Sequence, residues 1–295
     1  MGSLYERAER WEGALGSERL ELSLVHVKNG GAGPRLLLLH GNPGTLDDFA
    51  ALVPHLSFAG ELLLVDLPGF GKSPPAKDPQ TMTLAGLARA ALAVTDSLGW
   101  QTFEVVGHSH GGGVAQALAW GSSQRVRRLL LLGSLGFPAH SAYRQLALPG
   151  AGAAMRLIAS CVGLPGARAW LKAVQKGIAQ KAFYPEPLPD GRLEREVERI
   201  LSAPTILSSM VDVAKGGPCA ELAQNVASIA SPTIFLHGES DRLVPARHSR
   251  HLHELRVAAG RDSGFELVAG AGHMLPVTHA DLVARRLRGL SAPFA

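Results

Sequence analysis

Short apolar runs alternate with longer segments of helical periodicity along most of this 295-residue chain. Each run has six to eight residues, is rich in Leu and Val, and is bounded by residues that favour turns. This alternation is typical of βα units, in which parallel strands are covered by helices on both faces. The predicted strands cover residues 20–27, 35–40, 61–66, 102–107, 127–133, 233–238 and 265–270. We therefore expect an α/β fold with a mostly parallel sheet flanked by helices.

The segments between these runs carry apolar residues at helical spacing. In the segment from 81 to 99, the apolar residues Leu84, Leu87, Ala91 and Leu98 fall on one helical face, and Gly99 is a typical helix stop. Residues 110–120, 245–257 and 278–290 show the same periodicity, which predicts three further helices.

One long segment, residues 134–230, breaks the alternation because it has no strand pattern. Helical runs cover residues 153–163, 167–183 and 193–203, and prolines punctuate them. Since this segment lies between two predicted strands, we expect it to form a helical cap over the carboxyl edge of the sheet, where open α/β sheets bind ligands. Residues 1–133 and 231–295 would then form the core domain.

The run FEVVGHSHGGG, residues 103–113, places a serine between glycines directly after a predicted strand. Gly107, Ser109 and Gly111 fit the GxSxG pattern of a strained strand-to-helix turn that exposes a nucleophilic serine. A serine hydroxyl needs a base within hydrogen-bond reach and an acid that orients the base. Asp241 and His273 each follow the end of a later predicted strand and supply these two groups.

Composition and charge exclude several classes of protein. The net charge is +4, but the basic residues are scattered and aromatic residues make up only 5%, which argues against nucleic-acid binding. The two cysteines are too few for a disulfide scaffold. The N-terminal residues MGSLYERAERWEG lack the apolar run of a secretory signal, and no stretch approaches the ~18 apolar residues of a membrane span. We expect a cytoplasmic protein without a membrane-spanning helix.

Two motifs that suggest a metal or a nucleotide fail on inspection. His253 and Glu254 start an HExxH pattern, but Val257 occupies the position of its second histidine, so we predict no metal. The run DLPGFGKS ends like a phosphate-binding loop, but Asp66 stands where that loop needs its first glycine. No cofactor is therefore predicted.

Five segments together resemble the capped α/β-hydrolases: HGNPG (40–44), DLPGFGKS (66–73), GHSHGG (107–112), HGESDRLVP (237–245) and GAGHMLP (270–276). The resemblance implies an eight-stranded sheet with the cap inserted after the sixth strand. It also implies a catalytic triad of Ser109, Asp241 and His273, with the backbone amides of Asn42 and His110 as the oxyanion hole. The position of His110 at the start of a helix independently suits an anion.

The residues leave some assignments open. Glu239 could serve as the acid in place of Asp241, and His108 or His279 could serve as the base in place of His273. Met274 and Leu275 adjoin the base and are predicted to touch substrate. In the cap, Trp170, Phe183 and Met210 could either line a substrate pocket or pack the cap helices together.

The resemblance implies a hydrolase that cleaves a small to medium carboxylic ester, with a small-molecule acyl compound as its substrate. Haloalkane dehalogenases and epoxide hydrolases share the fold but need a carboxylate nucleophile, which Ser109 is not. A carbon–carbon bond hydrolase of the ring-fission-product type is a rival interpretation, and would need a cap arginine among Arg156, Arg168 and Arg192. Lactone, amide and thioester cleavage, a non-catalytic binding protein and a homodimer also remain open, because the sequence alone does not decide them.

Overall fold

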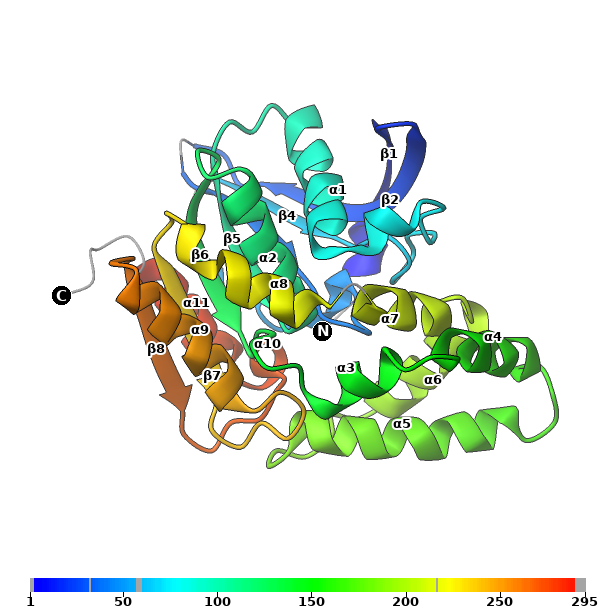
Figure 1. Cartoon of the computed structure of the whole chain (residues 1–295). Coiled ribbons are helices and arrows are strands. Elements are labelled where there is room, and N and C mark those ends of the chain that lie inside the picture. The colour runs from blue at the N-terminus through cyan, green and yellow to red at the C-terminus, as the bar shows by residue number, and fades with distance from the viewer. Residues whose placement is uncertain (1–2, 32, 57–59, 216, 290–295) are drawn as a thin grey trace.

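The computed structural model describes residues 3–31, 33–56, 60–215 and 217–289, and its centre is one eight-stranded sheet (Figure 1). The order across the sheet is β1-β2-β4-β3-β5-β6-β7-β8. β2 pairs antiparallel with β1 and β4, and all other neighbouring strands are parallel. The strands are β1 (Glu9–Leu15), β2 (Glu18–Lys28), β3 (Arg35–Leu39), β4 (Glu61–Val65), β5 (Phe103–His108), β6 (Val126–Leu132), β7 (Thr233–Gly238) and β8 (Ser263–Val268). The predicted mostly parallel α/β sheet is confirmed.

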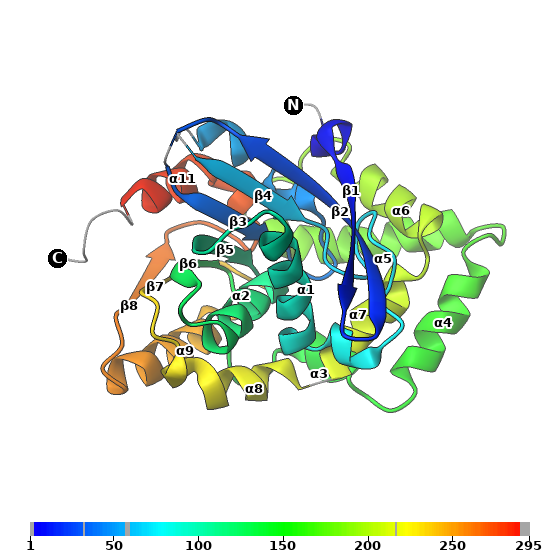
Figure 2. The ribbon, with the colours of Figure 1, turned by 90° about the horizontal axis from the view of Figure 1, so that it is seen from above.

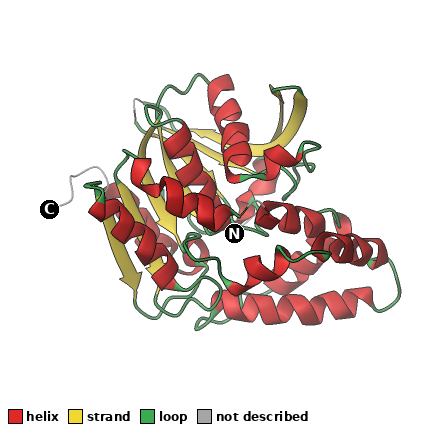
Figure 3. Ribbon diagram, in the orientation of Figure 1, coloured by secondary structure: helices red, strands yellow, loops and turns green. Residues whose placement is uncertain are grey.

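Helices cover both faces of the sheet (Figures 2 and 3). Alternate residues of each central strand point to opposite faces, so Leu37 and Leu39 join one hydrophobic core, and Leu36 and Leu38 join the other. The first core lies under α1 (Leu84–Ser97), α2 (His110–Gly121), α8 (Pro218–Asn225) and α9 (Ala246–Ala258). The second lies under α11 (Ala280–Gly289) and a short turn of 3-10 helix, η2 (Leu46–Phe49).

The structure departs from the predicted elements at the two edges of the sheet. β1 was not predicted, because its residues are exposed or half-buried and lack the apolar run of a central strand. β8 begins and ends two residues earlier than predicted. The helix predicted at 278–290 is interrupted at His279, which separates α10 (Leu275–Thr278) from α11, and residue 290 lies outside the described residues.

The described part of the segment between β6 and β7 is helical and contains no strand. Its helices are α3 (Ser141–Leu146), α4 (Ala151–Cys161), α5 (Ala167–Phe183), α6 (Arg192–Ser202), α7 (Ile206–Lys215) and α8. α8 packs against α2 of the sheet layer, whereas α3–α7 gather in a separate group on one side of the molecule (Figure 1). We call these five helices the α3–α7 group. The end of α5 reaches the sheet, where the backbone amide of His273 donates to the carbonyl of Ala182 at 3.0 Å.

Candidate active site

Ser109 occupies the sharp turn between β5 and α2. Its φ of 53° makes it the only non-glycine residue with positive φ among the described residues. Such a conformation costs about 1–3 kcal/mol and persists only where the surroundings enforce it. Here the carbonyl of Ser109 accepts hydrogen bonds from the amides of Gly112 and Leu135, both at 3.0 Å. A Cβ atom at Gly111 would overlap the carbonyls of Leu39 and His40, so the helix passes β3 at a distance that only glycine allows.

Asp241 and His273 come together at the carboxyl ends of β7 and β8. Oδ2 of Asp241 lies 2.6 Å from Nδ1 of His273, while Oδ1 accepts the amides of Leu243 and Val244 at 2.8 and 2.9 Å. Burial by itself would raise the pKa of Asp241, but the charge of His273 and hydrogen bonds from His237 and His273 outweigh it and lower that pKa. Asp241 is therefore a carboxylate that holds the imidazole of His273 through Nδ1. This leaves Nε2 of His273 available to another partner.

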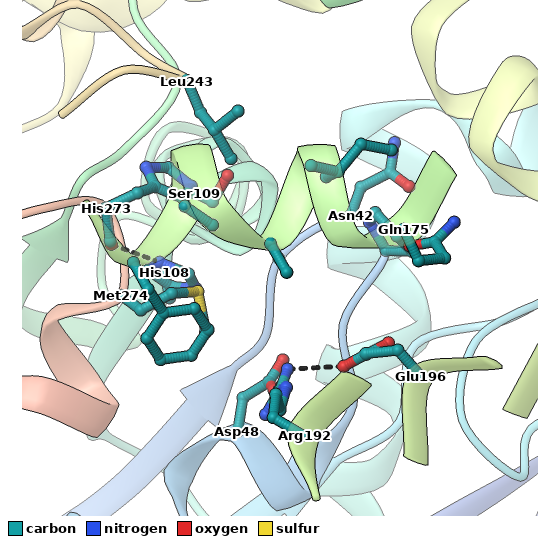
Figure 4. A pocket seen from close by; sticks show the side chains of 16 residues that line it. Asn42, Asp48, His108, Ser109, Gln175, Arg192, Glu196, Leu243, His273 and Met274 are labelled. Carbon is teal, nitrogen blue, oxygen red and sulfur yellow. Dashed lines mark hydrogen bonds and ion pairs between the residues drawn. The ribbon is translucent and has the colours of Figure 1, made fainter. Parts of the chain in front are cut away.

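Ser109 and His273 line the same pocket (Figure 4). The structure records no hydrogen bond between the hydroxyl of Ser109 and the ring of His273. Catalytic hydrogen bonds are often loose without substrate and tighten when it binds, so the missing bond does not exclude the two residues as base and nucleophile.

His108, which could have been the base, has a different partner. Its Nε2 lies 3.0 Å from the carbonyl oxygen of His273, and its ring packs beside the ring of His273 with centroids 4.9 Å apart. Burial first, and then the nearby His273, lower the pKa of His108 to about 3. A neutral ring that donates to this carbonyl supports the loop of His273.

Glu239 and His279 do not line the pocket. The carboxylate of Glu239 accepts the amide of Gly270 at 3.2 Å. The ring of His279 contacts Thr278 and Glu186. The structure thus pairs Asp241 with His273 behind the pocket, and it brings neither Glu239 nor His279 into contact with His273 or Ser109.

Asn42 lies in the loop after β3 and lines the pocket with Ser109, and His110 begins α2 directly after Ser109. The structure records no hydrogen-bond acceptor for the backbone amide of either residue, and the N-terminus of α2 adds its dipole at His110. The side chains of these residues meet at one group: Nδ2 of Asn42 donates to the hydroxyl of Tyr143 at 3.3 Å, and that hydroxyl lies 2.8 Å from Nδ1 of His110. Tyr143, on α3, therefore ties together the two loops that carry the free amides.

The DLPGFGKS segment forms hydrogen bonds with the loop that follows β3 and contains Asn42. The amide of Leu67 donates to Nε2 of His40 at 2.9 Å, which leaves Nδ1 of His40 to donate to the carbonyl of Gly41 at 2.8 Å. The carboxylate of Asp66 accepts the amides of Leu46 and Lys72 at 2.8 and 2.9 Å. This segment thus holds the loop of Asn42 in place through His40 and Gly41.

The pocket around Ser109 has an apolar wall and a polar wall. Its free volume is about 80 Å³, well below the roughly 300–1,000 Å³ of pockets for drug-sized ligands. The apolar wall consists of Ile178, Ala179, Ala182, Phe183, Leu243 and Met274. The polar wall consists of Asp48, Gln175, Arg192 and Glu196. A small substrate with one apolar and one polar end fits this division.

The structure places two of the five predicted substrate residues in this pocket, namely Met274 and Phe183. Leu275 is fully buried in the core under α11. Met210 packs against the other core, and Trp170 lies half-exposed in a separate surface hollow. Phe183 lies at the end of α5 that reaches the loop of His273, whereas Trp170 lies near the start of this helix, away from the sheet.

The polar wall contains a buried ion-pair network that was not predicted from the sequence. Arg192 on α6 lies 2.6 Å from both Asp48 and Glu196, and Arg199 also pairs with Glu196. Burial would raise the pKa of Asp48, but the charge of Arg192 and its hydrogen bond outweigh it and lower that pKa. The spacing of Arg192, Glu196 and Arg199 along one helical face was visible in the sequence, but their partner Asp48 was not.

Of the three arginines considered for a substrate carboxylate, Arg192 alone lines the pocket. Arg168 pairs with Glu198 on the surface, and Arg156 is exposed on α4. Arg192 is flanked by two carboxylates, so its charge is already compensated.

Comparisons with known proteins agree with this fold. A family model described as the alpha/beta hydrolase fold matches residues 34–153. The chain is 28% identical over 259 residues to the dihydrolipoyllysine-residue acetyltransferase component of an acetoin cleaving system from Cupriavidus necator; the match covers 87% of this chain and 63% of that protein's length. It is also 26% identical over 272 residues to a 2-hydroxy-6-oxo-6-phenylhexa-2,4-dienoate hydrolase from Burkholderia cepacia, with 88% of each chain covered.

Among solved structures, a thermophilic esterase from Thermogutta terrifontis superposes with a TM-score of 0.75. The match covers 96% of this chain and 98% of the esterase, at 20% identity. At this identity the likeness shows that the two chains share a fold.

Proposed function

Because the chain belongs to the α/β-hydrolase superfamily, we propose that it is a serine hydrolase that cleaves a small to medium carboxylic ester. The observation that supports this most directly is the geometry of three residues. A buried carboxylate, Asp241, orients His273, and His273 shares a small pocket with the strained Ser109. Asp241, His273 and Ser109 are the acid, base and nucleophile of the proposed mechanism.

The mechanism proceeds through an acyl-enzyme. As the Ser109 oxygen attacks the ester carbonyl, Nε2 of His273 takes the hydroxyl proton. The amides of Asn42 and His110 stabilise the oxyanion of the tetrahedral intermediate. His273 then gives its proton to the leaving alcohol. In the second half of the reaction His273 takes a proton from water as the water attacks the acyl-enzyme, and it returns that proton to the Ser109 oxygen as the acid leaves. Each chemical step uses only residues of this chain and water.

We assign residues 134–230 the role of a cap, with residues 1–133 and 231–295 as the core domain. Support comes from the pocket, whose lining includes residues of α5 and α6 beside the loops of the sheet. A cap in this position would exclude water from the oxyanion and so strengthen its hydrogen bonds. Movement of the cap would admit substrates larger than the present pocket volume.

The pocket favours an uncharged ester with a short acyl chain. Its apolar wall would bury the acyl group, while its small volume limits the length of that group. Arg192 is neutralised by Asp48 and Glu196, so it offers little net attraction to a substrate carboxylate.

The test compares Ser109→Ala with Ser160→Ala in purified protein, using nitrophenyl esters of increasing acyl length. Ser160 is an exposed serine on α4, and its hydroxyl donates to a backbone carbonyl of the same helix. Ser109→Ala should abolish turnover and labelling by a fluorophosphonate, while Ser160→Ala should keep both. Esterase activity that survives Ser109→Ala would contradict the proposal, and labelling without multiple turnover would indicate a non-catalytic binding protein.

The second candidate is carbon–carbon bond cleavage, the activity in the name of the relative from Burkholderia cepacia. Arg192 supplies the pocket arginine that this activity would need, although its charge is compensated by Asp48 and Glu196. A dienoate assay beside the ester panel separates the two: faster turnover of the dienoate, lost in Arg192→Gln, would favour the carbon–carbon bond hydrolase.

A further inference from the structure

Exposed large apolar side chains concentrate on one part of the α3–α7 group. Of the nine such side chains in the described part of the chain, seven lie between residues 148 and 184. Five of them belong to α4, α5 and the loop that joins them, and we call these five the apolar ridge. The apolar ridge consists of Leu157, Leu164, Trp170, Val174 and Ile178. Clustered apolar exposure of this kind marks an interaction surface.

The members of the apolar ridge are contiguous. Leu157, Leu164 and Trp170 line one surface hollow of about 450 Å³. From Trp170 the ridge continues along α5 through Val174 and Ile178, which follow at intervals of four residues and so lie on one side of the helix. Ile178 also lines the pocket of Ser109, so the ridge ends at the proposed active site.

The charged side chains of the segment that carries the ridge are all basic. Residues 147–185 contain five basic side chains and no acidic one. Two of the five, Arg168 and Lys172, pair with glutamates of α6. The other three, Arg156, Lys176 and Lys181, are exposed and form no ion pair with the described residues. The hairpin of α4 and α5 therefore combines exposed apolar side chains with uncompensated positive charge.

We propose that the α4–α5 hairpin docks on an anionic lipid surface. The apolar ridge would enter the boundary between headgroups and acyl chains, and Arg156, Lys176 and Lys181 would contact the anionic headgroups. None of the helices in the described ranges is long and apolar enough to cross a membrane, so the hairpin would lie on the surface. Trp170 suits this boundary because its indole is apolar with one polar N–H.

A second copy of the chain is the competing occupant of the ridge. In a two-fold symmetric dimer through this surface, the same basic side chains would approach one another without acidic partners from residues 147–185. An anionic membrane instead neutralises them, so the charges favour lipid. Docking does not require the proposed ester hydrolysis, and Ser109→Ala should therefore bind lipid like the unaltered protein.

The experiment measures co-sedimentation of the full chain with vesicles of phosphatidylcholine alone or with about 30% phosphatidylserine. Binding should need phosphatidylserine and weaken as salt is raised, because the headgroup attraction is screened. Replacing Leu164 and Trp170 together by Ser should weaken binding about tenfold or more, since two large apolar side chains no longer leave water. Changing Lys176 and Lys181 to Glu should abolish the preference for phosphatidylserine.

Matched controls lie on other parts of the surface. Val257→Ser removes an exposed apolar side chain from α9, and Arg89→Glu reverses an exposed charge on α1; both should bind like the unaltered protein. Trp170 is the most exposed of the four tryptophans, so its fluorescence should shift to the blue on binding. Absence of binding, or equal binding to both vesicle types, would overturn the proposal. The alternative outcome is a dimer that forms in the absence of lipid. If Leu164→Ser and Trp170→Ser together dissociate such a dimer, the ridge binds a second copy of the chain and not a membrane.

Discussion

Oδ2 of Asp241 lies 2.6 Å from Nδ1 of His273, although the two residues are 32 positions apart in the chain. Each stands in the loop that follows one of two neighbouring parallel strands, β7 and β8. Because parallel strands end at the same edge of a sheet, the fold brings these loops together next to the turn of Ser109. The first two predictions concern the chemistry that depends on this convergence.

Asp241→Asn should lower kcat by about 10⁴-fold, because a neutral amide does not stabilise the imidazolium and permits the wrong tautomer of His273. Steady-state kinetics with a nitrophenyl ester would measure this. Glu239→Gln is the matched control, since Glu239 is the carboxylate nearest to Asp241 in the sequence and its side chain accepts only the amide of Gly270. If Glu239→Gln loses activity and Asp241→Asn keeps it, the assignment of the acid is wrong.

Tyr143→Phe should lower kcat by about tenfold and leave KM nearly unchanged, because the hydroxyl aligns the loops of the oxyanion amides. The buried ring would remain, so packing should change little. Affinity for a trifluoromethyl ketone, which forms an oxyanion on the enzyme, should fall with kcat. Tyr184→Phe is the control, since the ring of Tyr184 packs under Arg242. A lower Tm with unchanged kcat would show that Tyr143 contributes to packing and does not position the amides.

Arg192→Met should destabilise the protein by about 3–5 kcal/mol, because it leaves the buried carboxylate of Asp48 without its ion-pair partner. Adding Asp48→Asn should recover part of this loss, since the uncompensated charge is then removed. Urea unfolding of both variants would measure the two effects. Arg168→Ala, which breaks an exposed pair with Glu198, should cost less than about 1 kcal/mol. Equal losses for Arg192→Met and Arg168→Ala would mean that the buried network does not stabilise the fold.

His140→Asn should reduce the acid sensitivity of the fold. Burial lowers the pKa of His140 to about 4, whereas an unfolded histidine titrates near 6.5. Between these values the unfolded chain binds a proton that the folded chain does not, so stability falls as the pH falls from 6.5 towards 4. For His140 the loss between pH 7 and pH 5 is about 2 kcal/mol.

Asparagine preserves the N-cap that His140 provides to α3, because its side-chain oxygen also accepts a backbone amide. Urea unfolding at pH 7 and pH 5 should therefore show a smaller pH effect in His140→Asn than in the unaltered protein. An identical pH effect in the two proteins would show that His140 titrates normally in the fold.

The sequence by itself determined the central strands, most of the helices and the positions of Ser109, Asp241 and His273 in the loops after strands. These features are local: a buried parallel strand needs a continuous apolar run, a helix shows its period, and glycines mark the turn that only they permit. β1 escaped prediction because an exposed edge strand needs no apolar run.

Only the tertiary structure decided which side of each helix faces the pocket. Along α5, Phe183 and Trp170 are both aromatic and both near apolar neighbours, yet packing turns one toward Ser109 and the other toward solvent. The same holds for Arg192 and Asp48, which are 144 positions apart, and for Tyr143, which meets Asn42 and His110. The rotation of a helix about its axis, and the pairing of side chains far apart in the sequence, depend on contacts with many distant residues. No local sequence pattern contains that information.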